Sequence, residues 1–364
     1  MAKGCRDIKE FKYEDHVGLW ANELKDFMPD MFFDTHEHIS PESIIKDMSE
    51  ERLRVALNTY NCMEWEDLLK IYSDLYSGKT LKYATCFGFV CREIDVRAAN
   101  SYVLHKAKED SRILPLLLAA PCDPGALKAG IEEAKELGVK VYGVKPYFEF
   151  AKRDGMFNAR DVELEDFVPT EALEFCNDNH LVLILHTCGI GMGDPKLRDK
   201  IENWLNVYPN MKLILAHMGR FYKPAEFTEF VNSDFMERNR DKQFWFDISS
   251  VTDPGVYDEI VSHKDFLDRI MFAADHPYGL FLGVEMYSET MGGIFLTRED
   301  DYPWADKEML AKFVEERKGL TYNNYHALKS LKDSIEKYIP ENEREALKKE
   351  IFLSRACRVF EVAE

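Results

Sequence analysis

From residue 81 onward, continuous apolar runs alternate with stretches in which apolar side chains recur at helical spacing. An apolar run bounded by turns is typical of a strand buried on both faces, and the segments between fit amphipathic helices that cover those faces. The predicted strands are 31–38, 81–90, 113–120, 141–147, 181–186, 211–217, 244–248 and 269–274. The predicted helices are 95–109, 124–137, 169–179, 195–207, 224–238 and 254–262. Alternating strands and helices indicate an α/β protein with a parallel sheet, and about eight strands indicate a (β/α)8 TIM barrel.

An open doubly wound sheet is the alternative, but no Gly-x-Gly-x-x-Gly follows an early strand. We expect one domain over residues 1–364, with a helical insertion after strand 1 at about 41–80. Within it, 65–76 has helical spacing. A second, irregular insertion after strand 8, at about 278–341, could form a lid or an oligomer contact. A helix at about 343–360 closes the chain.

Candidate metal ligands stand at the ends of the predicted strands. His36 and His38 are two residues apart on strand 1, so both project to the same side. His186 and His217 end strands 5 and 6, and Asp275 follows strand 8. In a barrel these ends meet at one mouth, where active sites are built. Imidazole and carboxylate ligands suit zinc, manganese or iron, which polarise a substrate oxygen or lower the pKa of bound water.

The motifs at these strand ends resemble the amidohydrolase superfamily, in particular its amidohydrolase family 2 branch. The matching pieces, in chain order, are Phe33-Asp34-Thr35-His36-Glu37-His38, Leu185-His186-Thr187, Leu215-Ala216-His217-Met218-Gly219 and Phe272-Ala273-Ala274-Asp275-His276-Pro277. The resemblance covers roughly 31–275 and the terminal helix, where Arg355 replaces the usual Asn. We expect that replacement to affect packing rather than catalysis. The branch contains metal-dependent TIM-barrel hydrolases and non-oxidative decarboxylases, such as aminocarboxymuconate semialdehyde decarboxylase.

The resemblance implies a role for each strand-end residue. His36, His38, His186 and Asp275 would bind one divalent metal, with zinc as the first candidate and manganese as the second. His217 would stand beside the metal and hydrogen-bond or protonate the substrate. Asp275 would also hold or deprotonate the metal-bound water, because a carboxylate beside a metal can shuttle its proton.

Four further residues are candidates for binding the substrate. Lys145, at the end of strand 4, would contact a substrate anion or form a structural ion pair. In other branches of the superfamily a lysine at this place is carboxylated and bridges two metals. Arg92 and Arg220 follow strands 2 and 6 and could bind a carboxylate through two hydrogen bonds, or form surface ion pairs. Tyr147 would line the pocket or simply pack. Asp247 ends strand 7 and could orient a loop or a metal-bound histidine.

Three functions are compatible with these residues. The first is a metal-dependent hydrolase in which activated water attacks an amide, ester or lactone. The second is a metal-dependent decarboxylase or hydratase acting on an aromatic or unsaturated carboxylic acid. Both use the same ligands, so the motifs do not separate them. The third, a non-catalytic barrel that only binds, has no need for the full set of His36, His38, His186 and Asp275.

Composition narrows the partners. The formal net charge of −19 disfavours nucleic acid and anionic membranes, so we expect a small-molecule substrate, with a carboxylic acid as one option. The eight cysteines include no Cys-x-x-Cys pair, no apolar run reaches membrane-span length, and the first residues lack the apolar stretch of a signal peptide. We therefore expect a cytoplasmic protein. A homodimer is a further possibility, because the two insertions offer contact surfaces and dimers are common in the branch that the chain resembles.

Overall fold

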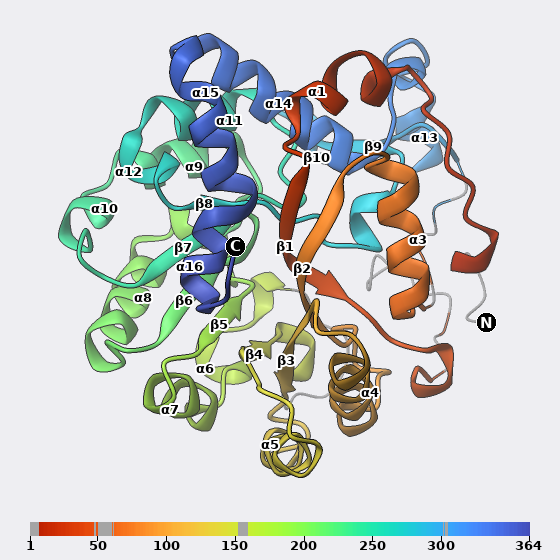
Figure 1. The fold of residues 1–364 in the computed structure, drawn as a ribbon. Helices are drawn as coiled ribbons and strands as arrows, with labels where there is room; N and C mark the ends of the chain where they lie inside the picture. Colours follow the sequence, from red (N-terminus) through yellow and green to blue (C-terminus); the bar gives the residue numbers. More distant parts are fainter. Residues whose placement is uncertain are drawn as a thin grey trace.

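The computed structural model describes residues 7–46, 49, 60, 62–151, 159–300, 302 and 305–364. Eight strands form one sheet in chain order, and each strand pairs with the next in parallel. Figure 1 shows the strands gathered at the centre of the molecule with helices around them. The strands are β1 (Met31–His38), β2 (Thr80–Phe87), β3 (Ile113–Ala119), β4 (Gly143–Pro146), β5 (Val182–Leu185), β6 (Lys212–Leu215), β7 (Phe244–Asp247) and β8 (Ile270–Met271).

Backbone hydrogen bonds between β1 and the segment after β8 close the barrel. The Thr35 N–H donates to the carbonyl of Phe272 at 3.2 Å, and the Asp275 N–H donates to the carbonyl of His36 at 3.0 Å. The predicted (β/α)8 barrel is therefore confirmed. Strand β3 is buried at every position, as its continuous apolar run predicted.

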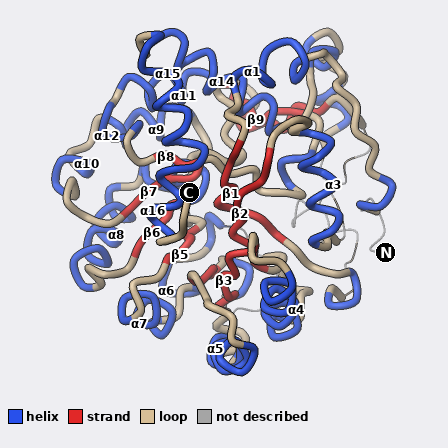
Figure 2. The backbone as a smooth tube through the Cα atoms, in the orientation of Figure 1, coloured by secondary structure: helices blue, strands red, loops and turns tan. Residues whose placement is uncertain are grey.

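The helices lie outside the strands (Figure 2). Several begin where an aspartate accepts a hydrogen bond from the first turn, as Asp95, Asp194 and Asp253 do for α4, α8 and α11. The helices of the barrel are α3 (Trp65–Leu75), α4 (Val96–Glu109), α5 (Ala126–Leu137), α6 (Leu164–Phe167), α7 (Thr170–Asp178), α8 (Pro195–Val207), α9 (Pro224–Val231), α10 (Phe235–Arg238), α11 (Pro254–Ser262) and α12 (Lys264–Leu267). In the described parts of the chain, no helix has the length and apolarity needed to cross a membrane.

The first insertion contains two helical segments among its described residues. The helix expected at 65–76 is α3, and a short helical turn covers Glu42–Ile44. The rest of this insertion lies largely outside the described residues. Ahead of the barrel, the short helix α1 (Lys25–Phe27) leads into β1.

The expectation of an irregular segment after β8 is wrong. Strands β9 (Gly283–Ser288) and β10 (Gly292–Thr297) form an antiparallel hairpin, and α13 (Lys307–Leu310) and α14 (Asn323–Tyr338) follow. Leu296, Leu310 and Leu320 form a small core of their own against this hairpin. Local apolar burial therefore orders a segment whose polar composition suggested a loop.

The chain ends in a continuous helical run, made of α15 (Glu341–Lys349), a π-helical turn at Glu350–Ser354 and α16 (Arg355–Phe360). This run contacts β1 and β8. The buried guanidinium of Arg355 donates to the carbonyls of Leu267 and Ile270, just before and within β8. Arg355 thus has the packing role that its departure from the family pattern predicted.

Candidate metal centre

A cavity of about 530 Å³ opens at the carboxyl ends of the strands. Most of the residues singled out in the sequence line it: His36, His38, Lys145, Tyr147, His186, His217, Arg220 and Asp275. Arg92 is not part of this lining as the structure describes it. The barrel therefore brings together side chains that are far apart in the sequence, as the strand-end pattern predicted. His36 and Asp275, for example, are 239 residues apart.

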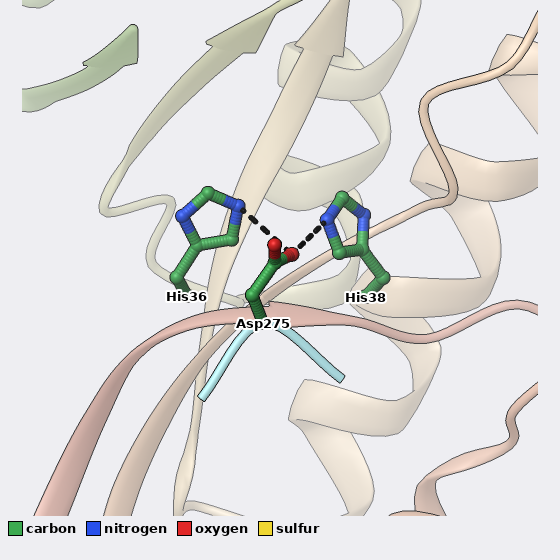
Figure 3. Close-up of side chains that lie close together, drawn as sticks. All are labelled: His36, His38 and Asp275. Atoms are coloured by element: carbon green, nitrogen blue, oxygen red, sulfur yellow. Dashed lines mark hydrogen bonds and ion pairs between the residues drawn. The ribbon is translucent and has the colours of Figure 1, made fainter. Parts of the chain in front are cut away.

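His36, His38 and Asp275 form the tightest group in the cavity. Each offers a ligand atom, and these atoms all lie within 4.8 Å of one another. An oxygen of Asp275, Oδ1, is 3.0 Å from His38 Nε2 and 3.6 Å from His36 Nε2. Figure 3 shows the carboxylate between the two imidazoles. The pairing of the two histidines follows from their spacing on β1.

The tautomer of His38 makes this group a fit for a metal. Its Nδ1 is 3.2 Å from the carbonyl of Gly88, which can only accept, so Nδ1 carries the hydrogen of the neutral ring. Burial lowers the pKa of His38, which keeps the ring neutral at pH 7. His38 Nε2 and the nearby Asp275 oxygen are then both electron-pair donors at 3.0 Å. A cation held by both atoms satisfies them, and one imidazole and one carboxylate suit a divalent metal.

Asp247, the last residue of β7, supports the group from behind. Its Oδ2 is 2.8 Å from His36 Nδ1, and its Oδ1 accepts the His217 backbone N–H at 3.0 Å. Burial alone would raise the pKa of Asp247, but attraction to His36 and their hydrogen bond outweigh it, and the pKa falls to about 2. An ionised Asp247 thus holds the hydrogen of His36 on Nδ1 and leaves Nε2 toward the cavity.

Asp275 is an ionised carboxylate in the same way. Burial acts to raise its pKa, but the attraction of the neighbouring histidines, His36 first, prevails, so the pKa lies below its usual value. The Ser250 hydroxyl donates to its second oxygen at 3.1 Å. Sequence reasoning missed Ser250, because no motif distinguishes the two serines of the loop after β7.

His186 and His217 stand beside the group of three. The ring of His217 lies 5.4 Å from that of His36 and 5.2 Å from that of His186. His186 does not belong to the set of atoms within 4.8 Å, so its place as a fourth ligand stays a prediction. Its Nδ1 faces the Thr187 carbonyl at 2.8 Å, which again leaves Nε2 as a donor of electrons.

His217 has its own hydrogen-bond partners. Its Nδ1 faces the carbonyl and the hydroxyl of Ser249, at 3.1 and 2.9 Å. The Ser249 hydroxyl itself donates to Asp247 at 2.5 Å, so Nδ1 of His217 is the donor of its pair. Burial lowers the pKa of His217 to about 4. At pH 7 its Nε2 therefore accepts a hydrogen bond, and it can protonate a substrate only after taking up a proton.

Lys145 points to the metal group. Its ammonium nitrogen is 3.3 Å from His36 Nε2 and 5.1 Å from the centre of the Phe87 ring, and the side chain is buried. Burial lowers the pKa of Lys145 to about 8. The lysine thus adds positive charge at the floor of the cavity.

The two candidate arginines lie in different places. Nη1 of Arg220 is 4.0 Å from Glu285 Oε1 on β9, and its guanidinium is 5.2 Å from the centre of the Tyr222 ring. Among the residues that the structure describes, none accepts a hydrogen bond from its buried Nε. Arg92 is half-buried, and its backbone N–H donates to Glu149 at 3.2 Å. Of the two, Arg220 is the one that reaches the cavity.

The remaining walls were largely missed from the sequence. They come from the loops after β4, β6 and β8 and from the hairpin: Phe148, Glu149, Arg160, Phe221, Tyr222, Phe281, Glu285, Tyr287 and Phe295. The hairpin carries a sequence signal, since two glycine-led runs rich in β-forming residues flank a three-residue turn. The loops carry none.

Comparison with known proteins places the chain in a family. The model of the amidohydrolase family, in its family 2 form, matches residues 34–314, and the chain belongs to this family. The match covers His36, His38 and Asp275 as well as the hairpin of β9 and β10. No curated protein sequence matches the chain.

Solved structures of similar fold include both hydrolases and decarboxylases. An amidohydrolase from Burkholderia multivorans with bound HEPES has a TM-score of 0.53 at 13% identity, over 92% of this chain and 100% of that one. A probable 2-pyrone-4,6-dicarboxylic acid hydrolase from Acinetobacter baumannii, with citric acid bound, has a TM-score of 0.51 at 13% identity, over 91% and 99%. The 5-carboxyvanillate decarboxylase from Sphingomonas paucimobilis has a TM-score of 0.51 at 13% identity, over 92% and 100%. At these identities the likeness concerns the fold.

Proposed function

We propose that this protein is a metal-dependent hydrolase that cleaves an amide, ester or lactone of a small molecule carrying an acidic group. The observation that carries the proposal is the buried group of His36, His38 and Asp275, whose electron-pair donors converge at the barrel mouth. Membership of an enzyme family supports it. A barrel that only binds would have no use for this group.

The residues that would hold the metal are His36, His38 and Asp275, with His186 as the fourth ligand. Zinc is the first candidate, because two or three imidazoles and one carboxylate are typical zinc ligands, and manganese is the second. When bound, the metal would supply a Lewis acid that polarises a substrate oxygen and lowers the pKa of water. Asp247 keeps His36 in the tautomer that such a ligand needs.

The protein's own groups divide the remaining work. The Asp275 carboxylate lines the cavity, its second oxygen accepts from Ser250, and it can take a proton from an attacking water. His217 Nε2 accepts a hydrogen bond from water or substrate, and once protonated it can deliver that proton to a leaving group.

Arg220 supports an acidic substrate. Arg220 lines the cavity, and a guanidinium can bind a carboxylate through two parallel hydrogen bonds. Lys145 adds a second positive charge deeper in the cavity. Tyr147 lines the same cavity, with its ring 5.1 Å from that of His186, and would pack against the substrate.

A second candidate is a non-oxidative decarboxylase of an aromatic or unsaturated acid. The observation in its favour is the wall of aromatic rings, which includes Tyr147, Phe148, Tyr222 and Phe295, around a cavity with Arg220. Flat rings stack favourably on aromatic side chains. In this reaction Asp275, which is ionised at rest, would first take a proton from water and then deliver it to the carbon that loses carbon dioxide.

One experiment separates the two reactions. The metal-loaded protein is incubated with a panel of lactones, esters and amides bearing a carboxylate, and released acid is titrated for the lactones and esters while released amine is measured for the amides. In parallel it is incubated with hydroxylated benzoic acids, and released carbon dioxide is measured. Acid or amine release that Asp275→Asn abolishes supports the hydrolase; carbon dioxide release that the same variant abolishes supports the decarboxylase. A metal-loaded protein that turns over neither panel would count against both.

A further inference from the structure

Two buried acidic residues of β1 hold the backbone on both sides of Asp275. Oδ1 of Asp34 accepts the Ala274 N–H at 3.1 Å, and Oε2 of Glu37 accepts the His276 N–H at 3.2 Å. Both side chains are fully buried, and neither lines the cavity. The two hydrogen bonds therefore fix the backbone of Ala274 and His276, the neighbours of the candidate metal ligand Asp275.

The backbone of Asp275 has a conformation that depends on such contacts. Its φ is 56°, in the left-handed region that side chains with a Cβ rarely adopt. A residue stays in this conformation only where its surroundings impose it, and such residues gather at functional sites. Left to itself, the loop after β8 would relax and turn the carboxylate away from His36 and His38.

Glu37 contacts His276 at two points. Besides the backbone bond, its Oε1 faces Nδ1 of the His276 ring at 2.8 Å. The other ring nitrogen of His276 faces the Asn324 amide at 2.9 Å, on α14. At Gly279, three residues along the loop, an added Cβ would lie 2.2 Å from Asn324 Oδ1. The loop is thus fixed between β1 and α14.

We infer that Glu37 is a positioning residue that sets the place of the Asp275 carboxylate through the backbone and ring of His276. The inference rests on the proposed metal site but adds a residue that does not touch it. Because Glu37 lies between His36 and His38, a single strand fixes two imidazole ligands directly and the carboxylate ligand indirectly. The group of three is then assembled before a metal arrives.

The test is cobalt(II) binding to Glu37→Gln in the full-length protein. A carboxylate offers two oxygen acceptors, whereas the Gln amide offers one oxygen and one NH2 group. In Glu37→Gln an amide N–H therefore faces either the backbone N–H or the ring Nδ1 of His276, and one of the two hydrogen bonds to His276 is lost. The loss of such outer hydrogen bonds typically weakens metal binding roughly 10–100-fold. We expect the cobalt Kd, measured by chelator competition, to rise by that factor. We also expect the visible spectrum of bound cobalt to move toward that of Asp275→Asn.

Two asparagines provide a matched pair of further variants. Asn324→Ala removes the partner of His276, and we expect a smaller change of the same kind. Asn100→Ala also removes a buried amide that fixes backbone, since Asn100 bonds the N–H and the carbonyl of Leu118 at 2.7 and 3.1 Å on β3. It should lower the melting temperature and leave the cobalt spectrum unchanged.

The outcomes separate this inference from the proposal beneath it. Folded Glu37→Gln and Asn324→Ala proteins with the wild-type cobalt Kd and spectrum would overturn the role of Glu37 while leaving the metal site standing. If Glu37→Gln fails to fold, Asn324→Ala against Asn100→Ala decides by the same readouts. A wild-type protein that binds no cobalt would overturn the metal site itself, and the role of Glu37 with it.

Discussion

At the scale of single residues, hydrogen bonds decide which nitrogen each histidine offers to the cavity. The Nδ1 atoms of His36, His38 and His186 face Asp247 and two backbone carbonyls, so the Nε2 atoms are the ones left for a metal. The strand alternation predicts that His36 and His38 share a side. It does not predict their tautomers, because these depend on acceptors that are distant in the sequence.

Asp247→Asn tests this control of tautomer. The variant keeps the size of the side chain but cannot offer acceptors to both His36 Nδ1 and the His217 backbone N–H. We expect metal affinity to fall roughly 10–100-fold, as is typical for the loss of a partner behind a metal ligand. Chelator competition measures it. Asp258→Asn, at an exposed ion pair with Lys337, is the control and should bind metal normally. Equal affinity in Asp247→Asn would count against the role of Asp247.

Arg220→Gln tests the acidic substrate. A hydrogen bond to a charged group contributes about 1.5–3 kcal/mol, so KM for a carboxylate substrate should rise roughly 10–100-fold. With a neutral analogue, such as the methyl ester of the same acid, KM should change little. Arg97→Gln, which breaks an exposed pair with Asp123, is the control. A KM that rises equally for the acid and its ester would show that Arg220 contributes to the shape of the cavity but does not recognise the negative charge of the substrate.

At the scale of secondary structure, the barrel could be predicted and the cavity wall could not. Strand β3 is apolar at every position, so its burial is evident from the sequence. The segment after β8 was expected to be irregular because its composition is polar, yet β9 and β10 pair and three leucines form a core against them. The two strands are adjacent in the sequence, but the core that stabilises them includes Leu310 and Leu320 from later in the chain, and local composition does not record such packing.

The hairpin makes a prediction of its own through Glu285. This carboxylate lies 4.0 Å from Arg220, and its side chain is about one third exposed. A partly exposed pair contributes modestly, so Glu285→Gln should lower KM for an anionic substrate roughly two- to fivefold by freeing Arg220. The kinetic assay above measures this change. Glu289→Gln, at the exposed turn of the same hairpin, should leave KM unaltered. A raised KM in Glu285→Gln would instead show that the carboxylate itself helps to bind the substrate.

At the scale of the whole molecule, buried neutral histidines make the metal-free protein sensitive to acid. Burial lowers the pKa of both His217 and His276 to about 4, against 6.5 in the unfolded chain. Between pH 6.5 and 4 the unfolded chain therefore binds more protons, and stability falls as the pH falls. Each histidine adds a slope of up to about 1.4 kcal/mol per pH unit.

Urea denaturation of the metal-free protein between pH 4 and 8 measures this effect. We expect the free energy of unfolding to change little from these histidines above pH 6.5 and to decline steeply below it. Asp247, with a pKa of about 2, adds a further loss of stability as the pH drops below about 4. The buried carboxyls of Asp34 and Glu37, whose pKa values burial raises, give a slope of opposite sign. The direct check is therefore NMR titration of the two rings: His217 and His276 rings that take up a proton near pH 6.5 would contradict their buried, neutral state.

The central claim is that one divalent metal binds to His36, His38 and Asp275. Metal analysis by inductively coupled plasma mass spectrometry, on the purified full-length protein and on His38→Ala, tests it most directly. The wild-type protein should hold about one divalent metal per chain, and His38→Ala should lose most of it while keeping its circular dichroism spectrum. A folded wild-type protein without stoichiometric metal, even after incubation with zinc or manganese, would contradict the claim, and so would full retention of metal by His38→Ala.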